Sequence, residues 1–151
     1  MPNCIQISTV LCLITVLALS ACSHKTVYSD SVVTEVNTYP NVSMGIIDED
    51  IRLDLMTLLI VNNNDYAIEG GRDDFWVEEY RDGKWQVIEV EERDGTGEAV
   101  DFYGQQLYQI DVSSVYGELP EGHYRILKSF KTKNQDEIIT FCLSSEFDIK
   151  K

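Results

Sequence analysis

The sequence predicts an all-β fold, an antiparallel β-sandwich of about seven strands with Greek-key connections. Three observations predict it. From residue 32 onward, apolar side chains recur at every second position, which is the period of a strand and not of a helix. Short apolar segments alternate with clusters of Gly, Asn, Asp and Ser, which are typical turn residues. The 151 residues, 44% of them hydrophobic, suffice for one packed domain.

The first clear strand is predicted over residues 51–61. Its odd positions are apolar except for Thr57, and polar residues separate them at 52 and 54. Its second half is apolar on both faces, as expected for a central strand. Residues 62–65 (NNND) then mark a turn, and a short extended piece over residues 66–68 ends at a Gly-Gly pair.

The clearest hairpin is predicted over residues 75–88. Two segments rich in aromatic and β-branched residues, 75–80 and 84–88, flank Arg81-Asp82-Gly83. An Asp-Gly pair tolerates the positive φ that a tight hairpin turn requires. Gly83 is therefore assigned to the turn.

The rest of the chain continues this pattern. We expect an acidic loop over residues 89–101, strands over 105–112, 123–130 and 139–147, and turns over 113–117 and 131–136. The alternation places four large side chains between the two layers of the sandwich: Leu53, Trp85, Tyr124 and Phe141.

One short motif narrows the type of sandwich. Leu119, Gly122 and Tyr124 have the L-x-x-G-x-Y spacing of a tyrosine corner, in which Gly permits a bend and the Tyr hydroxyl returns to an upstream backbone group. This device is typical of Greek-key sandwiches. It favours an Ig-like fold over a closed barrel.

The N-terminus has the features of an export signal. Residues 10–19 (VLCLITVLAL) form an apolar run that suits a signal peptide and is too short to span a bilayer. Residues 19–22 (LSAC) follow and resemble the lipobox of bacterial lipoproteins, in which the cysteine is modified with diacylglycerol and becomes the new N-terminus. No Lys or Arg precedes the apolar run, which departs from the usual pattern. The alternative is an uncleaved anchor helix over residues 4–21.

These features divide the chain into three parts. Residues 1–21 are assigned to a lipoprotein signal peptide, 22–31 to a tether lipidated at Cys22, and 32–151 to the sandwich domain. The domain is expected to be held by its lipid on the extracytoplasmic face of the cell membrane. Net charge is −14, from 26 acidic and 12 basic residues, so a nucleic-acid partner is not expected.

Several segments of the domain resemble a known family. Residues 80–85 (YRDGKW), 110–113 (IDVS) and 119–128 (LPEGHYRILK), in this order and spacing, are similar to a bacterial Ig-like domain found in exported lipoproteins of Gram-positive bacteria. The resemblance covers roughly residues 32–149. It implies structural roles for Trp85 in the core and Tyr124 in the corner, a Gram-positive source, and no catalytic residue to carry over.

No catalytic, cofactor or metal site is predicted. The two histidines fall in unpromising places: His24 lies in the tether, and His123 is expected at the exposed start of a strand. Cys142 would be the one cysteine left besides Cys22 after processing, so it is read as a passive strand residue. An EF-hand is rejected because Val90 would occupy the first ligand position. A looser calcium site in residues 48–50 or 89–101 stays open.

Three functions from different classes follow from these observations. The first is a non-enzymatic module that binds an unknown protein or cell-wall partner through loops and strand edges. The second is a proteinase-inhibitor-like sandwich that presents residues 89–104 to a secreted enzyme. The third is a small carboxylate-dependent hydrolase, for which paired acids would be required.

Overall fold

The computed structural model describes residues 26–90, 98–134 and 137–150. Ten strands and one helical turn follow one another in chain order: β1 (Tyr28–Asp30), β2 (Val42–Ile46), β3 (Met56–Asn62), β4 (Ile68–Gly71), β5 (Phe75–Arg81), β6 (Lys84–Ile88), β7 (Ala99–Phe102), β8 (Gly104–Ile110), α1 (Val112–Tyr116), β9 (Gly122–Asn134) and β10 (Glu137–Ile149). All strand pairs are antiparallel. The predicted all-β class is confirmed, with ten strands in the described residues in place of the seven or so expected.

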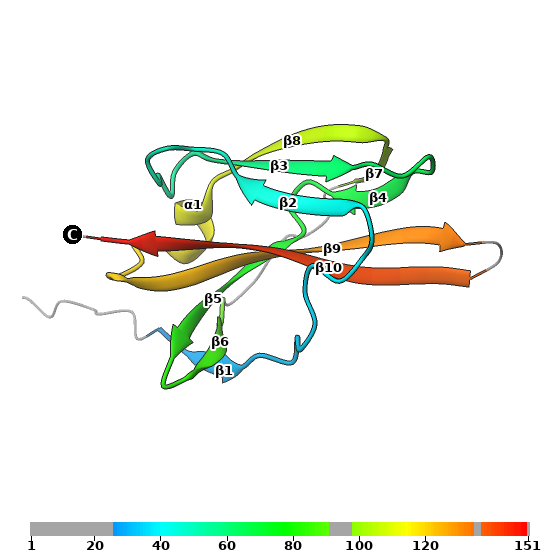
Figure 1. Ribbon diagram of the computed structural model, residues 1–151. Coiled ribbons are helices and arrows are strands. Elements are labelled where there is room, and N and C mark those ends of the chain that lie inside the picture. The colour runs from blue at the N-terminus through cyan, green and yellow to red at the C-terminus, as the bar shows by residue number, and fades with distance from the viewer. Residues whose placement is uncertain (1–25, 91–97, 135–136, 151) are drawn as a thin grey trace, which may run out of the picture.

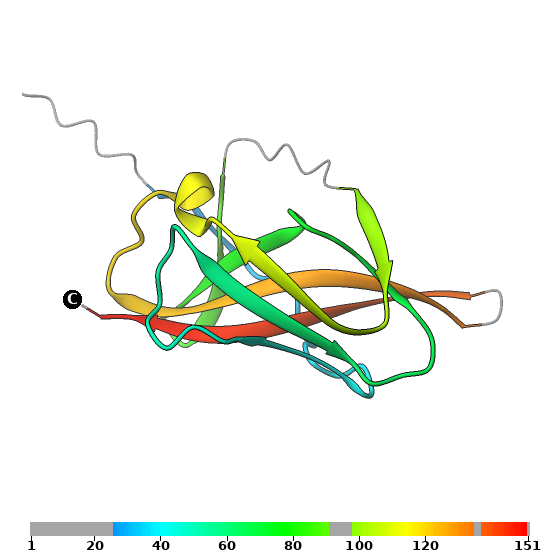
Figure 2. The same ribbon diagram turned by 90° about the horizontal axis from the view of Figure 1, so that it is seen from above.

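The strands form two sheets that pack face to face. The larger sheet has the order β1-β6-β5-β9-β4-β7, with β10 on the other edge of β9, and the smaller sheet has the order β2-β3-β8. Figure 1 shows the smaller sheet lying over the long β9–β10 hairpin, and Figure 2 shows β3 and β8 crossing above it. This is the sandwich that the alternation predicts.

Strand β3 shows how the alternation builds the core. Met56, Leu58 and Ile60 are each 0% exposed and face the larger sheet, while the residues between them are half-buried. Residues 51–55 lie outside the strand, so the strand predicted over 51–61 starts too early. Leu53 only packs against the rim of the core.

Three segments differ from their predicted conformation. Part of the expected 89–101 loop is strand β7, because it pairs with β4 from Ile68↔Phe102 to Gly71↔Ala99. Residues 131–134 continue β9 instead of turning, because β10 keeps its register with β9 as far as Glu137↔Asn134. The predicted turn at 113–117 is the helical turn α1, which Asp111 caps by accepting a hydrogen bond from the Ser114 amide.

The tyrosine-corner residues lie at the start of β9. Tyr124 is 0% exposed, and its hydroxyl donates a hydrogen bond of 2.8 Å to the Pro120 carbonyl. A Cβ atom at Gly122 would lie 3.0 Å from the Tyr124 ring, so glycine gives the ring the space it needs. Leu119 is buried beside them. The corner therefore fixes where the chain enters the larger sheet after α1.

Tyr124→Phe is expected to lower the free energy of unfolding by about 1–2 kcal/mol, because the Pro120 carbonyl loses its partner. Urea denaturation followed by tryptophan fluorescence measures the change. Tyr103→Phe, at a position 65% exposed, is the matched control and should change stability by less than about 0.5 kcal/mol. Equal effects of the two substitutions would contradict this role of the corner.

Candidate functional site

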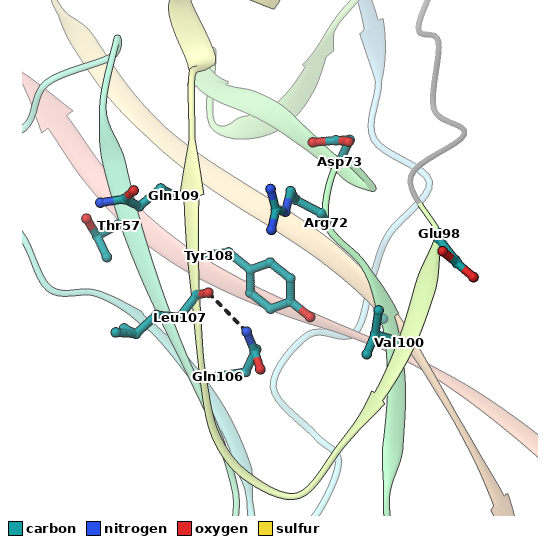
Figure 3. A pocket seen from close by; sticks show the side chains of 10 residues that line it. Thr57, Arg72, Asp73, Glu98, Val100, Gln106, Leu107, Tyr108 and Gln109 are labelled. Carbon is teal, nitrogen blue, oxygen red and sulfur yellow. Dashed lines mark hydrogen bonds between the residues drawn. The ribbon is translucent and has the colours of Figure 1, made fainter.

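A groove of about 550 Å³ opens between β8 and the β4–β7 pair. Figure 3 shows side chains from both sides converging on it, with the Tyr108 ring between β8 and β4. The lining residues come from β3, β4, β8, the turn after β4, and β7 with the residue before it: Thr57, Gly70, Arg72, Asp73, Glu98, Val100, Gln106, Leu107, Tyr108 and Gln109. The volume is in the range of small-ligand sites, but the groove is open along its length.

A buried ammonium group holds the turn that forms one wall of the groove. Lys128 on β9 is 0% exposed, and its Nζ donates hydrogen bonds to the carbonyls of Gly71, Arg72 and Asp74 at 2.7, 3.2 and 3.1 Å. Burial lowers the pKa of Lys128 to about 8. The three carbonyls satisfy the amine, so this lysine positions the Arg72–Asp73 wall.

Tyr108 forms the floor of the groove. Its side chain is 6% exposed, its ring lies 4.8 Å from Lys128 Nζ, and it meets the Phe102 ring edge-on. Burial raises the pKa of the Tyr108 phenol, and the charge of Arg72 opposes this shift. Among the described residues its hydroxyl has no hydrogen-bond partner.

The lining of the groove offers several side chains that can bind polar groups. Hydrogen-bonding side chains are provided by Arg72, Gln106, Gln109 and Thr57, and acids by Asp73 and Glu98. The lining residues include no histidine or cysteine that could form a nucleophile–base pair. Nor do the described parts of the chain gather three or more His, Cys, Asp or Glu that could hold a metal ion. The calcium ligands considered at 91–97 lie outside the described residues.

A family model described as a bacterial Ig-like domain matches residues 38–147. The chain belongs to this family. No curated protein and no solved structure matches it significantly. Ig-like domains of this kind are typically non-catalytic and act as interaction modules.

The outer face of the Ig-like domain carries a buried ion pair. Glu78 on β5 and Arg125 on β9 lie opposite each other in register, and the Arg125 guanidinium donates two hydrogen bonds to Glu78 Oε2, at 2.8 and 2.6 Å. Exposure of the two side chains is 0% and 7%. The Trp85 ring stacks over the guanidinium at 4.4 Å. Together these groups form a closed polar layer on the side of the sheet away from the core.

The N-terminal segment covers this ion pair. Ser31 Oγ donates to Glu78 Oε1 at 2.7 Å, and Arg125 contacts the Val33 carbonyl. Farther along, Asn37 binds β10 through its backbone amide, which donates to the Cys142 carbonyl, and through its side chain, which exchanges hydrogen bonds with Ser144. Part of the expected tether thus belongs to the fold, because Tyr28–Asp30 form β1 and pair with β6.

Trp85 lies on the outer face and not in the core as predicted. It pairs across the hairpin with Tyr80, whose side chain is 47% exposed, and both point away from the smaller sheet. The error has a physical cause. Trp85 fits the alternation of the strand, but the N-terminal segment covers the outer face of this hairpin, so outward positions are also partly buried. Gly83 has φ 81° and forms the turn with Asp82. Tyr124 and Phe141 lie in the core.

The remaining sequence candidates are placed as follows. Cys22 lies outside the described residues. Cys142 is a half-buried free thiol facing away from the core, and burial raises its pKa, so it stays protonated. No helix in the described part of the chain is long and apolar enough to cross a membrane.

Sequence reasoning missed Arg125, Lys128 and Tyr108, and it takes Glu78 for a surface acid. For Arg125 a signal existed, because a single charge interrupts the apolar stretch of residues 124–127 (YRIL). For Lys128 no signal existed, since a lysine in a strand is normally solvated.

Arg125→Met is expected to lower the free energy of unfolding by about 3–5 kcal/mol, because Glu78 is left buried without a counter-charge. Chemical denaturation measures the loss. The double variant Glu78→Leu/Arg125→Met removes both charges and should regain most of it. If the double variant is as unstable as the single one, the loss comes from packing and not from the unpaired carboxylate.

The pKa of His123 is raised, first by its hydrogen bond to Asp148 and then by Glu146. A histidine whose folded pKa exceeds its unfolded value adds stability below about pH 6.5, and the gain is lost as pH rises through the folded pKa. NMR titration should therefore show the His123 pKa falling in Asp148→Asn, while the His24 resonance serves as an internal control. An unchanged His123 titration would exclude Asp148 as the cause.

Proposed function

We propose that this protein is a non-enzymatic interaction module held on the extracytoplasmic face of a bacterial membrane by lipid on Cys22. Membership of the bacterial Ig-like domain family is the observation that carries the interaction role. The LSAC sequence after a short apolar run supports the anchor.

The position of β1 bears on how such a domain would sit. Only residues 23–27 separate Cys22 from β1, so an extended tether reaches about 20 Å at most. In Figure 1, β1 and β8 lie on opposite sides of the β9–β10 hairpin. The groove beside β8 therefore lies away from the side where the tether joins the domain. This arrangement favours the groove as the surface that meets a partner.

Labelling with tritiated palmitate tests the anchor. The wild-type protein expressed in a Gram-positive host should be labelled and recovered with membranes, and Cys22→Ala should be unlabelled. Cys142→Ala is the matched control, because it removes the other cysteine of the processed chain and should stay labelled. Labelling that persists in Cys22→Ala would contradict lipidation at this residue.

Site-specific photo-crosslinking tests the interaction role. A photoreactive amino acid at Tyr103, on the exposed link between β7 and β8, should trap a partner in intact cells. The same group at Tyr66, 37% exposed at another loop, is the control. If neither position traps any protein or cell-wall polymer, the interaction role is contradicted.

A further inference from the structure

β8 has an unpaired edge among the described residues. It is the terminal strand of its sheet and pairs only with β3. The Ile47 amide donates to the Thr57 carbonyl, so the odd residues of β3 direct their backbone groups toward β2 and the even residues direct theirs toward β8. The register Leu58↔Tyr108 then places the backbone groups of the even β8 residues against β3.

The odd residues of β8 therefore point their backbone groups outward. These are Gln105, Leu107 and Gln109, which together offer three N–H donors and three C=O acceptors. The Leu107 carbonyl accepts a hydrogen bond of 3.2 Å from the side chain of the adjacent Gln106, which supports this direction. Among the described residues this row of donors and acceptors has no main-chain partner, so it is a template for another strand.

The sequence of β8 lacks the residues that usually prevent an edge strand from pairing. Natural edge strands usually carry a charge, a proline or a bulge that prevents pairing. β8 reads GQQLYQI, without a charged residue or proline, in a chain of which 25% of the residues are charged. The other edge strands differ from β8: β1 and β7 carry Asp30 and Asp101, the Ile46 amide of β2 donates to Ser145, and Asn37 binds β10.

Space for an added strand exists next to the edge. The groove of about 550 Å³ runs beside β8, with Gln106, Leu107 and Gln109 along one wall and Tyr108 at its floor. Figure 3 shows the Tyr108 hydroxyl directed into it. Leu107, 55% exposed, and Val100, 57% exposed, offer apolar contacts to the side chains of an extended segment.

The charge of the groove and of the whole chain indicates which kind of segment would bind there. Asp73 and Glu98 line the groove against a single cation, Arg72. Net charge is −14, so a second copy of the chain would be repelled. A basic segment is attracted to the same surface.

We propose that β8 binds an extended, basic segment of a partner protein as an added strand, with the edge of Gln105, Leu107 and Gln109 pairing with its backbone. The proposal rests on the interaction role above and gives it a site and a ligand class. Main-chain hydrogen bonds would supply affinity, and the rim acids would select Lys or Arg.

The test uses the full chain in detergent and a synthetic peptide that alternates valine and lysine. Hydrogen exchange read by NMR should slow at the amides of Gln105, Leu107 and Gln109 when the peptide is added. The amides of Gln106 and Tyr108, which face β3, should not change. A peptide alternating valine and glutamate should bind at least about tenfold more weakly at low salt.

N-methylated peptides separate strand pairing from charge attraction alone. Methyl groups on every second peptide nitrogen should abolish binding in one alternate frame and spare it in the other, because successive amides of a strand point to opposite edges and only one set faces β8. Leu107→Pro, which removes the central outward N–H, should lose binding while keeping the tryptophan fluorescence of the folded domain. The methylated peptides leave the protein unaltered, so they decide the question even if Leu107→Pro unfolds.

Three results would overturn the proposal: equal binding of both methylated frames, no slowed exchange with the valine–lysine peptide, or slowed exchange that depends on protein concentration without peptide. The concentration-dependent result would mean that β8 pairs with a second copy of this chain and not with a partner segment. Crosslinking at Tyr103 without protection of β8 would overturn strand addition and leave the interaction role intact.

Discussion

Strand β9 is enclosed on both faces and along both edges, and most other elements take their position from it. Its inward residues Tyr124, Ile126 and Phe130 pack under the smaller sheet, and its outward residues Arg125 and Leu127 are equally buried. β10 follows one edge over the full strand, while β5 and then β4 share the other. Because β5 and β4 lie end to end along one edge, the turn between them must be held, and Lys128 holds it.

This enclosure explains what could be read from the sequence and what could not. The Asp82-Gly83 turn and the Tyr124 corner depend on local geometry, so their residue types reveal them. Alternation identifies a strand but does not tell which of its faces is covered. Trp85 was assigned to the core for this reason, although it belongs to the covered outer face. The N-terminal segment that covers this face is a long-range contact, and nothing in its own pattern announces it.

The groove could not be predicted from the sequence, because it too depends on long-range pairing. Tyr108 reads as an ordinary inward residue of a strand, and its exposure to the groove depends on β7 leaving β8 to pair with β4. The sequence predicts a loop over residues 89–101, which include most of β7, so it does not predict the opening between β7 and β8. The sequence shows that β8 has no charged residue. This matters for binding only because the structure places β8 at the end of a sheet.

The pairing of β1 with β6 has a mechanical consequence. β1 is the first strand after the proposed anchor, and three residue pairs join it to β6. The segment that covers Glu78 and Arg125 begins directly after β1, at Ser31. Tension between the membrane and the domain would load this short strand before any part of the core. Release of β1 would draw Ser31, the next residue, away from Glu78, so the buried ion pair takes part of its cover from the segment nearest the proposed anchor.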